Sequence, residues 1–278
     1  VKVEQKAFCA VTKDYSIWHR SASGGAFSEI CRAWGDDKTL VVGAAWDGLY
    51  VHHVGIVGVQ NIKPLCNSKY VSSHIEDTFR EIRDYLKTGK VIFCGTPCQV
   101  SGLRSFLRKD YDNLIIADYI CRGTNSPKVW RKYLDSFEER YGSKVVYCKA
   151  KSKEYGWRNL TQKVILENGK HIYETKDQSN YTKGYLRTGV YCRPSCYDCK
   201  SKGYPRMSDI TLADFWGIEK VNNSMEKNLG TSLVMVNSKK GVAYFEKVKK
   251  RINYVEVPFK SIESGNPSLN KPLTSAKV

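Results

Sequence analysis

Apolar and polar residues alternate along the chain in blocks that predict strands and helices in turn. Short apolar runs, typical of buried strands, span residues 8–12, 40–46, 50–57, 91–94 and 114–120. Apolar residues at helical spacing predict helices over residues 27–34, 73–87, 100–107 and 129–137. Because strands and helices alternate between residues 40 and 142, we expect an α/β fold: a mixed, largely parallel sheet covered by helices.

The pattern changes after residue 142. Three short runs of alternating residues predict a β-rich insert at about residues 143–175, which is a plausible cover over a site. Further strands are expected over residues 208–217 and 232–236, and a helix over 241–251. The final residues, 258–278, are rich in Pro and Ser and predict a partly extended or disordered tail. We therefore divide the chain into an N-terminal part (1–90), a central α/β part with the insert (91–257) and the tail (258–278).

Length and composition narrow the class of protein. A chain of 278 residues can bury a large hydrophobic core. No apolar stretch approaches the roughly 20 residues of a membrane helix, and the first residues lack the apolar segment of a secretory signal. We therefore expect a cytoplasmic protein with no membrane span, whose ten cysteines are reduced or bind metal rather than form disulfides.

The net charge of +17 favours an anionic partner. Lysines and arginines are scattered along the chain and are densest at residues 247–251. No nucleic-acid-binding motif is present, so we expect no nucleic-acid partner. The basic residues could instead attract an acidic protein or an anionic small molecule, or form an ordinary solvated surface.

Two cysteines follow predicted strands. The segment 91–107 (VIFCGTPCQVSGLRSFL) places Cys98 where a buried strand leads into a helix, and Cys121 follows the next strand. In open α/β sheets, ligands bind at these carboxyl ends of the strands, and the free N–H groups of the new helix suit an anion. Cys98 and Cys121 are therefore candidates for a shared site.

Cys196 and Cys199 form a CxxC pair that completes a set of four thiols from three segments. Such a set can bind an iron–sulfur cluster or a structural zinc ion, and the spacing alone leaves both open. Cys192 is the main alternative ligand, whereas Cys94 lies within a strand and is interpreted as a small buried apolar residue.

A serine- and glycine-rich turn, Ser21–Gly25, precedes the first long helix. Such a turn can hold a phosphate, because no bulky side chain blocks the approach to the backbone N–H groups. An ordinary helix cap gives the same pattern, so the turn alone does not decide between them. The sequence has no HExxH, P-loop or GxGxxG motif and no Ser-His-Asp order, so hydrolases, kinases and standard nicotinamide-binding enzymes have no support.

Several segments together resemble the beta-subunit family of coenzyme F-420 hydrogenases and dehydrogenases, which are iron–sulfur flavoproteins. The resemblance spans about residues 7–240 and rests on SASGG (21–25), NSKYVS (67–72), GTPCQVSGLRSFL (95–107), residues 118–126, RPSCYDCK (193–200) and SDITLADFWGI (208–218). Bacterial relatives of this kind often occur with surface-polysaccharide genes, which makes the deazaflavin itself an uncertain substrate.

The resemblance implies bound FAD and one [4Fe-4S] cluster. It assigns flavin phosphate binding to Ser23, Gly24 and Gly25, the rest of the flavin site to Lys69, Thr96 and Gln99, and cluster ligation to Cys98, Cys121, Cys196 and Cys199. The implied activity is that of a flavin-dependent reductase or dehydrogenase, in which electrons pass through the cluster to the flavin and then to a substrate as hydride. The alternative is a non-catalytic subunit that relays electrons to a partner enzyme.

Two features depart from the family. Many members carry a ferredoxin-like double-cluster segment ahead of this region, and nothing ahead of Cys9 provides one. Either such a domain precedes these residues, or a ferredoxin or another electron-donor protein is the partner. Arg122 stands where the family often has histidine, which changes the charge beside Cys121. We therefore expect a different small-molecule substrate, one that is anionic.

Overall fold

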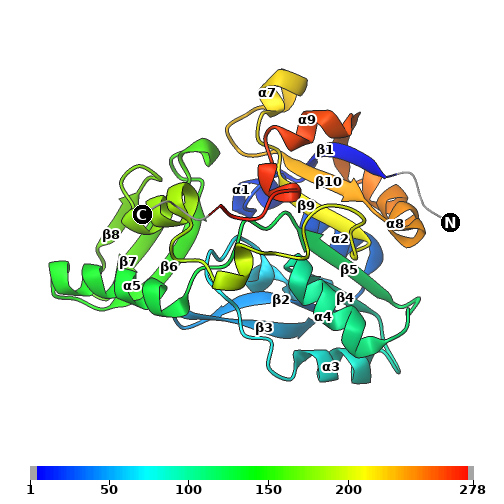
Figure 1. Cartoon of the computed structure of the whole chain (residues 1–278), viewed down its shortest axis with the longest axis horizontal. Coiled ribbons are helices and arrows are strands. Elements are labelled where there is room, and N and C mark those ends of the chain that lie inside the picture. Colours follow the sequence, from blue (N-terminus) through cyan, green and yellow to red (C-terminus); the bar gives the residue numbers. More distant parts are fainter. Residues whose placement is uncertain (1–4, 275–278) are drawn as a thin grey trace.

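A computed structural model describes residues 5–274 and shows one large mixed sheet (Figure 1). Its eight strands follow the order β11-β1-β10-β9-β5-β4-β2-β3. They are β1 (Lys6–Thr12), β2 (Leu40–Asp47), β3 (Tyr50–Val57), β4 (Val91–Gly95), β5 (Leu114–Tyr119), β9 (Ile210–Asp214), β10 (Ser232–Val236) and β11 (Ile252–Val257). The four central strands β9, β5, β4 and β2 are parallel, and the strands at both edges are antiparallel to their neighbours. The predicted mixed sheet is confirmed, with its parallel pairs at the centre.

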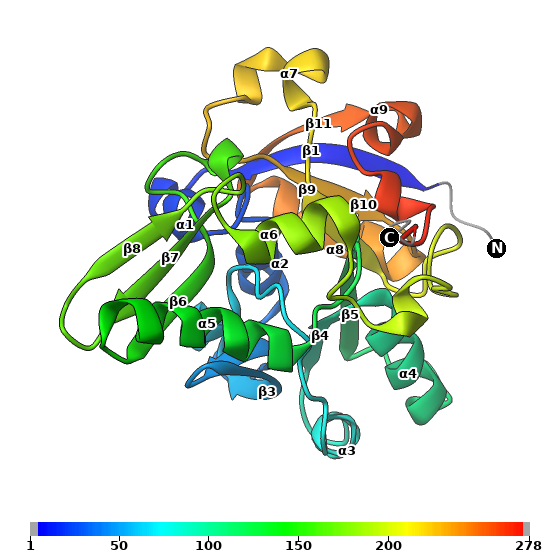
Figure 2. The ribbon, with the colours of Figure 1, turned by 60° about the vertical axis from the view of Figure 1, so that its left-hand side comes forward.

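A second, antiparallel sheet forms the predicted β-rich insert. It contains β6 (Val145–Ser152), β7 (Thr161–Leu166) and β8 (His171–Glu174) in that order. Helix α5 (Pro127–Tyr141) lies across this sheet (Figure 2), with Trp130, Leu134 and Phe137 in one apolar cluster with residues of β6 and β7. The same cluster includes Val51 of β3 and Val71, so the core of the insert is continuous with the large sheet.

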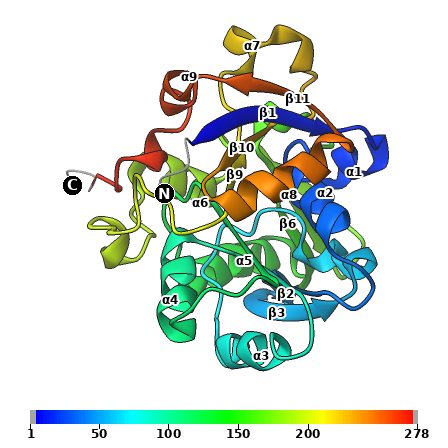
Figure 3. The same ribbon diagram turned by 90° about the vertical axis from the view of Figure 1, so that its right-hand side faces the viewer.

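Helices cover both faces of the large sheet. On one face, α2 (Ala26–Trp34) and α8 (Lys239–Lys249) pack on β1 and β10, and Figure 3 shows the two helices beside each other. On the other face, α3 (Thr78–Tyr85) and α4 (Pro97–Leu107) pack on β4 and β5. The shorter helices are α1 (Tyr15–Arg20), α6 (Asn180–Lys183), α7 (Ile218–Val221) and α9 (Phe259–Glu263). Among the described residues, no helix has both the length and the apolar character needed to span a bilayer.

Helix α3 begins later than its periodicity predicts. Expected from Ser73, it starts at Thr78, because His74 instead pairs with β3. The backbone N–H of His74 donates to Val51 O at 3.1 Å, and the carbonyl of His74 accepts from His53 N at 2.8 Å. These bonds hold His74 against β3, and a turn at Glu76, with φ +46°, follows before the helix begins. The helical spacing of the apolar residues did not reveal this.

The end of the chain also differs from the prediction. Residues 259–263 form α9, a 3-10 turn follows at Pro267–Leu269, and Ile262, Leu269 and Leu273 are buried. The expected extended or disordered tail is therefore wrong for this part, while its last residues, 275–278, lie outside the described residues. The physical reason is that isolated apolar residues in a polar segment find partners in the core, Ile262 and Leu269 beside Phe215 and Ile218.

Candidate functional site

A cavity of about 460 Å³ lies at the carboxyl ends of the parallel strands. Each of the four strands contributes to its wall, among others with Ala44 from β2, Cys94 from β4, Tyr119 from β5 and Asp214 from β9. This is the crevice where open α/β sheets bind ligands, and the volume lies within the range of roughly 300–1,000 Å³ of small-molecule sites.

The serine–glycine turn borders this cavity. Ser23 and Gly25 line it, together with the first residues of α2. Gly25 has φ +84°, a left-handed conformation that favours glycine, and it begins α2 without a side chain to cap the helix. Gly24 does not line the cavity: a Cβ there would lie 2.3 Å from Ala10 O, so this glycine allows the turn to pack directly on β1. The turn thus presents the amino end of a helix to the cavity.

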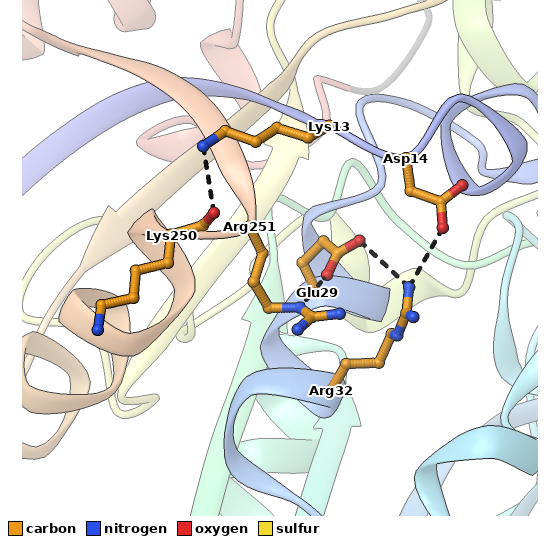
Figure 4. A pocket seen from close by; sticks show the side chains of 6 residues that line it. All are labelled: Lys13, Asp14, Glu29, Arg32, Lys250 and Arg251. Carbon is orange, nitrogen blue, oxygen red and sulfur yellow. Dashed lines mark hydrogen bonds and ion pairs between the residues drawn. The ribbon is translucent and has the colours of Figure 1, made fainter.

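A network of charges holds the start of α2 from behind (Figure 4). The Thr12 hydroxyl donates to the buried Glu29 carboxylate at 2.7 Å, and Thr12 N donates to Gly24 O at 2.8 Å. Arg251 donates to the other Glu29 oxygen at 2.6 Å, and Arg32 lies between Glu29 and Asp14. Glu29, Arg32 and Arg251 border a small hollow of about 240 Å³. Because these charges are paired, the network serves to fix the turn.

Lys69 and Thr96 also line the cavity, and Gln99 does not. The Lys69 ammonium donates to the carbonyls of Pro64 and Cys66, both at 2.9 Å. Burial lowers the pKa of Lys69 to about 8, and the nearby Cys66 and Cys94 thiols oppose the shift. Thr96 and Gln99 form a capping box at the start of α4, so the contribution of Gln99 is to shape the turn that carries Thr96.

One of the four predicted cluster ligands borders the cavity, and Cys98, Cys196 and Cys199 do not line it. Cys121 lies in its wall, and Cys98 is exposed in the first turn of α4. Burial raises the pKa of the Cys121 thiol to about 12; Lys202 opposes the rise, and Cys98, Cys196 and Cys199 add to it. All three thiols are therefore within electrostatic reach of Cys121. Within residues 5–274, no three Cys, His, Asp or Glu side chains stand close enough together to hold a single metal ion.

Cys192, the alternative ligand, has a different environment. Its thiol is buried and donates to Asn125 Oδ1 at 3.3 Å. Burial raises its pKa to about 11. The residue packs with Tyr185 and Leu273 in one apolar cluster, which favours a structural cysteine, and the predicted ligand Cys196 packs against the same cluster.

A comparison with protein families assigns the chain. The family model for the C terminus of the beta subunit of coenzyme F420 hydrogenase/dehydrogenase matches residues 88–261. The chain belongs to this family. The family resemblance predicted from the motifs is thus confirmed, and it places the chain among oxidoreductase subunits that transfer electrons.

Among solved structures, a chain of the F420-reducing [NiFe] hydrogenase complex from Methanosarcina barkeri, studied by xenon derivatization, has a similar fold. It superposes with a TM-score of 0.57 at 18% sequence identity, over 95% of this chain and 84% of that chain. At this identity the likeness shows a shared fold alone. No curated protein matches the sequence.

The insert of this beta-subunit family member reaches the cavity through residues that the sequence did not single out. The fully buried Lys151 side chain forms an ion pair of 2.5 Å with Asp214, and Trp157 stacks on Trp216 with ring centroids 4.2 Å apart. Lys153 donates to Ser23 O at 2.8 Å, and burial lowers its pKa to about 7. The sequence indicates these contacts only indirectly, because Asp214 lies near the end of a predicted strand. The insert is therefore fixed both to β9 and to the serine–glycine turn.

The end of the chain contributes a further wall. Residues 265–268 line the cavity, and a Cβ at Gly265 would lie 2.0 Å from Trp216 O. Glycine is thus required where the tail passes over Trp216. Nothing in the Pro- and Ser-rich sequence of the tail indicates this position, since it depends on a contact with a residue almost fifty positions earlier.

Proposed function

We propose that the protein is an iron–sulfur flavoprotein oxidoreductase that passes electrons between a [4Fe-4S] cluster and FAD to reduce or oxidise a small molecule. One observation carries the proposal: a single cavity extends from the serine–glycine turn to Cys121, and Cys98, Cys196 and Cys199 lie within electrostatic reach of Cys121. Family membership supports the electron-transfer part, and the flavin and the substrate belong to the proposal. We expect the protein to act in the cytoplasm.

The residues around the cavity fit a flavin. The amino end of α2 and the Lys69 ammonium offer hydrogen-bond donors and positive charge to a pyrophosphate. Thr96 lies elsewhere in the wall, and the remaining wall is largely apolar or aromatic, with Tyr70, Ile120, Leu186 and Trp216. Ser23, Gly25, Lys69 and Thr96 would bind the cofactor, while Gly24 and Gln99 would hold the backbone that does so. FAD supplies the two-electron redox chemistry when bound.

The thiols fit a cluster in their chemistry. Thiolates are the usual ligands of iron–sulfur clusters, and a four-iron cluster is larger than one ion and keeps its ligands further apart. Cys121 borders the cavity and Cys98 is exposed, so that the predicted ligands extend from the solvent to the cavity. The cluster supplies one-electron transfer when bound.

The test is to purify the protein without oxygen and to measure its absorption spectrum, flavin, iron, sulfide and zinc. We expect FAD together with equal amounts of iron and sulfide, about four of each per chain if all four thiols bind one cluster. Stoichiometric zinc in place of iron, in freshly purified protein, would contradict the cluster. Iron and sulfide without any flavin would contradict the flavin site alone.

The exposure of Cys98 favours a second candidate, a subunit that only relays electrons between protein partners. A hydrogenase complex is the assembly in which the structurally similar chain was solved, which supports a protein partner such as ferredoxin. The chemically reduced protein should be mixed with oxidised ferredoxin and, separately, with a deazaflavin, which accepts electrons only as hydride. Reoxidation by both supports the enzyme. Reoxidation by ferredoxin alone supports either the relay or an enzyme whose hydride acceptor is not a deazaflavin.

A further inference from the structure

Lys202 lies between the CxxC pair and β9 and joins two distant parts of the chain. Its ammonium donates to the backbone carbonyl of Cys121 and to that of Ser268, the latter at 2.9 Å. Cys121 follows β5, and Ser268 belongs to the tail segment that lines the cavity. One half-buried side chain therefore connects a predicted cluster ligand with the cavity-lining tail.

The charge of Lys202 acts on the predicted ligands. The ionisable groups within electrostatic reach of its ammonium are Cys121, Cys199, Arg206 and Cys196, and the three cysteines would carry negative charge as cluster ligands. Arg206 is itself paired with the buried Asp118 at 2.8 Å, so its charge is compensated. Arg122 follows Cys121 in the sequence but directs its guanidinium to the carbonyls of Tyr185 and Leu186. Lys202 is thus a cation that reaches three of the four thiols.

We propose that Lys202 is a positioning residue that raises the reduction potential of the cluster and fixes the tail against the Cys121 end of the cavity. The proposal rests on the proposed function, because it needs a cluster at these thiols. Reduction adds one electron to a cluster that already carries negative thiolates, and a nearby positive charge stabilises that added charge. The same ammonium donates to the Ser268 carbonyl, so one group would both stabilise the reduced cluster and hold the tail in place.

The first measurement is a redox titration of the cluster, followed by electron paramagnetic resonance in the anaerobic holoprotein. Lys202→Gln removes the charge and keeps a hydrogen-bond donor, and we expect a midpoint potential more negative than that of the wild type. Lys202→Arg should restore a potential close to the wild type. Lys200→Met is the matched control: it removes a charge two residues away, where Lys200 is exposed and paired with Asp198, and it should leave the potential unchanged.

The second measurement does not need a cluster. Amide hydrogen exchange of residues 265–274 in the cluster-free protein should be faster in Lys202→Met, which removes both hydrogen bonds, than in Lys200→Met or the wild type. Unchanged exchange in this segment would overturn the tether.

The outcomes separate this proposal from the proposed function. A wild-type protein without iron would contradict the proposed function. A full cluster whose potential is the same in Lys202→Gln and the wild type would overturn the role of Lys202 and leave the proposed function intact. If Lys202→Gln bound no cluster while Lys202→Arg bound one with an unchanged potential, the requirement for a cation at this position would be supported.

Discussion

His53 shows how a single residue connects the sheet with the site. Its ring lies between the Ser73 hydroxyl, 2.8 Å from Nδ1, and the carbonyl oxygen of Cys94, 3.2 Å from Nε2. Ser73 in turn accepts a hydrogen bond from the Gln99 amide at 3.0 Å. The alternation of residues in the strand predicted over 50–57 gives the face of a side chain and not its hydrogen-bond partners, so the sequence does not reveal this environment. The structure places His53 in a polar chain that joins β3, the end of β4 and the start of α4.

This environment predicts a pH dependence of stability. Burial lowers the pKa of His53 to about 4, so the unfolded chain binds a proton near pH 6.5 and the folded chain only near pH 4. The free energy of unfolding should therefore fall as the pH drops from 6.5 towards 4, by about 2 kcal/mol at pH 5 from this residue alone. Urea denaturation at pH 7 and pH 5 measures the effect, and His53→Gln should reduce it. His52→Gln, on the other face of the same strand, is the control; an equal change in both variants would contradict the assignment to His53.

Ligand cysteines and structural cysteines should respond differently to serine. Cys98→Ser, Cys121→Ser, Cys196→Ser and Cys199→Ser should each lose the cluster or bind it weakly, since a hydroxyl is a poor ligand for iron in such a site. Cys148→Ser should keep full iron and flavin, at a stability cost of roughly 1 kcal/mol. Cys192→Ser should behave like Cys148→Ser, because Cys192 is buried and bonded to Asn125. The iron content of each purified variant tests the ligand assignment. Loss of iron in Cys192→Ser together with a full cluster in Cys121→Ser would show that the assignment is wrong.

At the scale of elements, the insert is docked on the sheet by a buried ion pair. Lys151 has a fully buried side chain and contacts the ring faces of Trp157 and Trp216, with its ammonium 4.9 and 5.3 Å from their centroids. Its only carboxylate partner in the described residues is Asp214, at the end of β9. A buried charge without its partner is unstable, so the insert and β9 depend on each other.

Lys151→Met should therefore lower the free energy of unfolding by about 3 kcal/mol, because Asp214 loses its partner. In the double variant Lys151→Met/Asp214→Asn the loss should be smaller than the sum of the two single losses. Chemical denaturation of the three variants measures this coupling. Lys163→Met is the control on the same insert, since Lys163 pairs with the exposed Glu154, and its effect should stay below about 1 kcal/mol. Additive losses at Lys151 and Asp214 would argue against the coupling.

The sequence predicted structural elements that depend on residues close together in the chain, and it missed contacts between residues far apart in the chain. The strand predicted over residues 91–94, which the structure extends to Gly95, the helix that starts beside Cys98 and the turn at Gly25 all follow from local patterns. The order of strands and helices predicted a parallel centre with a crevice. The contact of Lys151 with Asp214 and that of Lys202 with Ser268 span more than sixty residues each. Such contacts arise only when the chain is folded, so the tail over the cavity could not be predicted.

At the scale of the whole molecule, the dominant feature is the net charge of +17. Some of this charge is compensated within the site, as for Lys151 by Asp214 and Arg206 by Asp118. Most lysines and arginines remain at the surface, where they attract an acidic partner over about 8 Å at physiological salt and further at low salt. The ferredoxin of the proposed function would be such a partner, and its electron would enter at the exposed Cys98.

Electron transfer from an acidic ferredoxin should therefore slow as salt rises from low to physiological strength, because screening weakens the long-range attraction that brings the two proteins together. Stopped-flow absorption of the flavin and cluster bands gives the rate. A small uncharged reductant serves as the control, and its rate should change little over the same range. Comparing the two salt dependences separates the docking of the two proteins from electron transfer to the cofactors. Salt weakens the encounter of two charged surfaces and has little effect on an uncharged reductant. A ferredoxin rate that is indifferent to salt would mean that the lysines form an ordinary solvated surface, and the partner would then have to recognise the protein by shape and apolar contact instead.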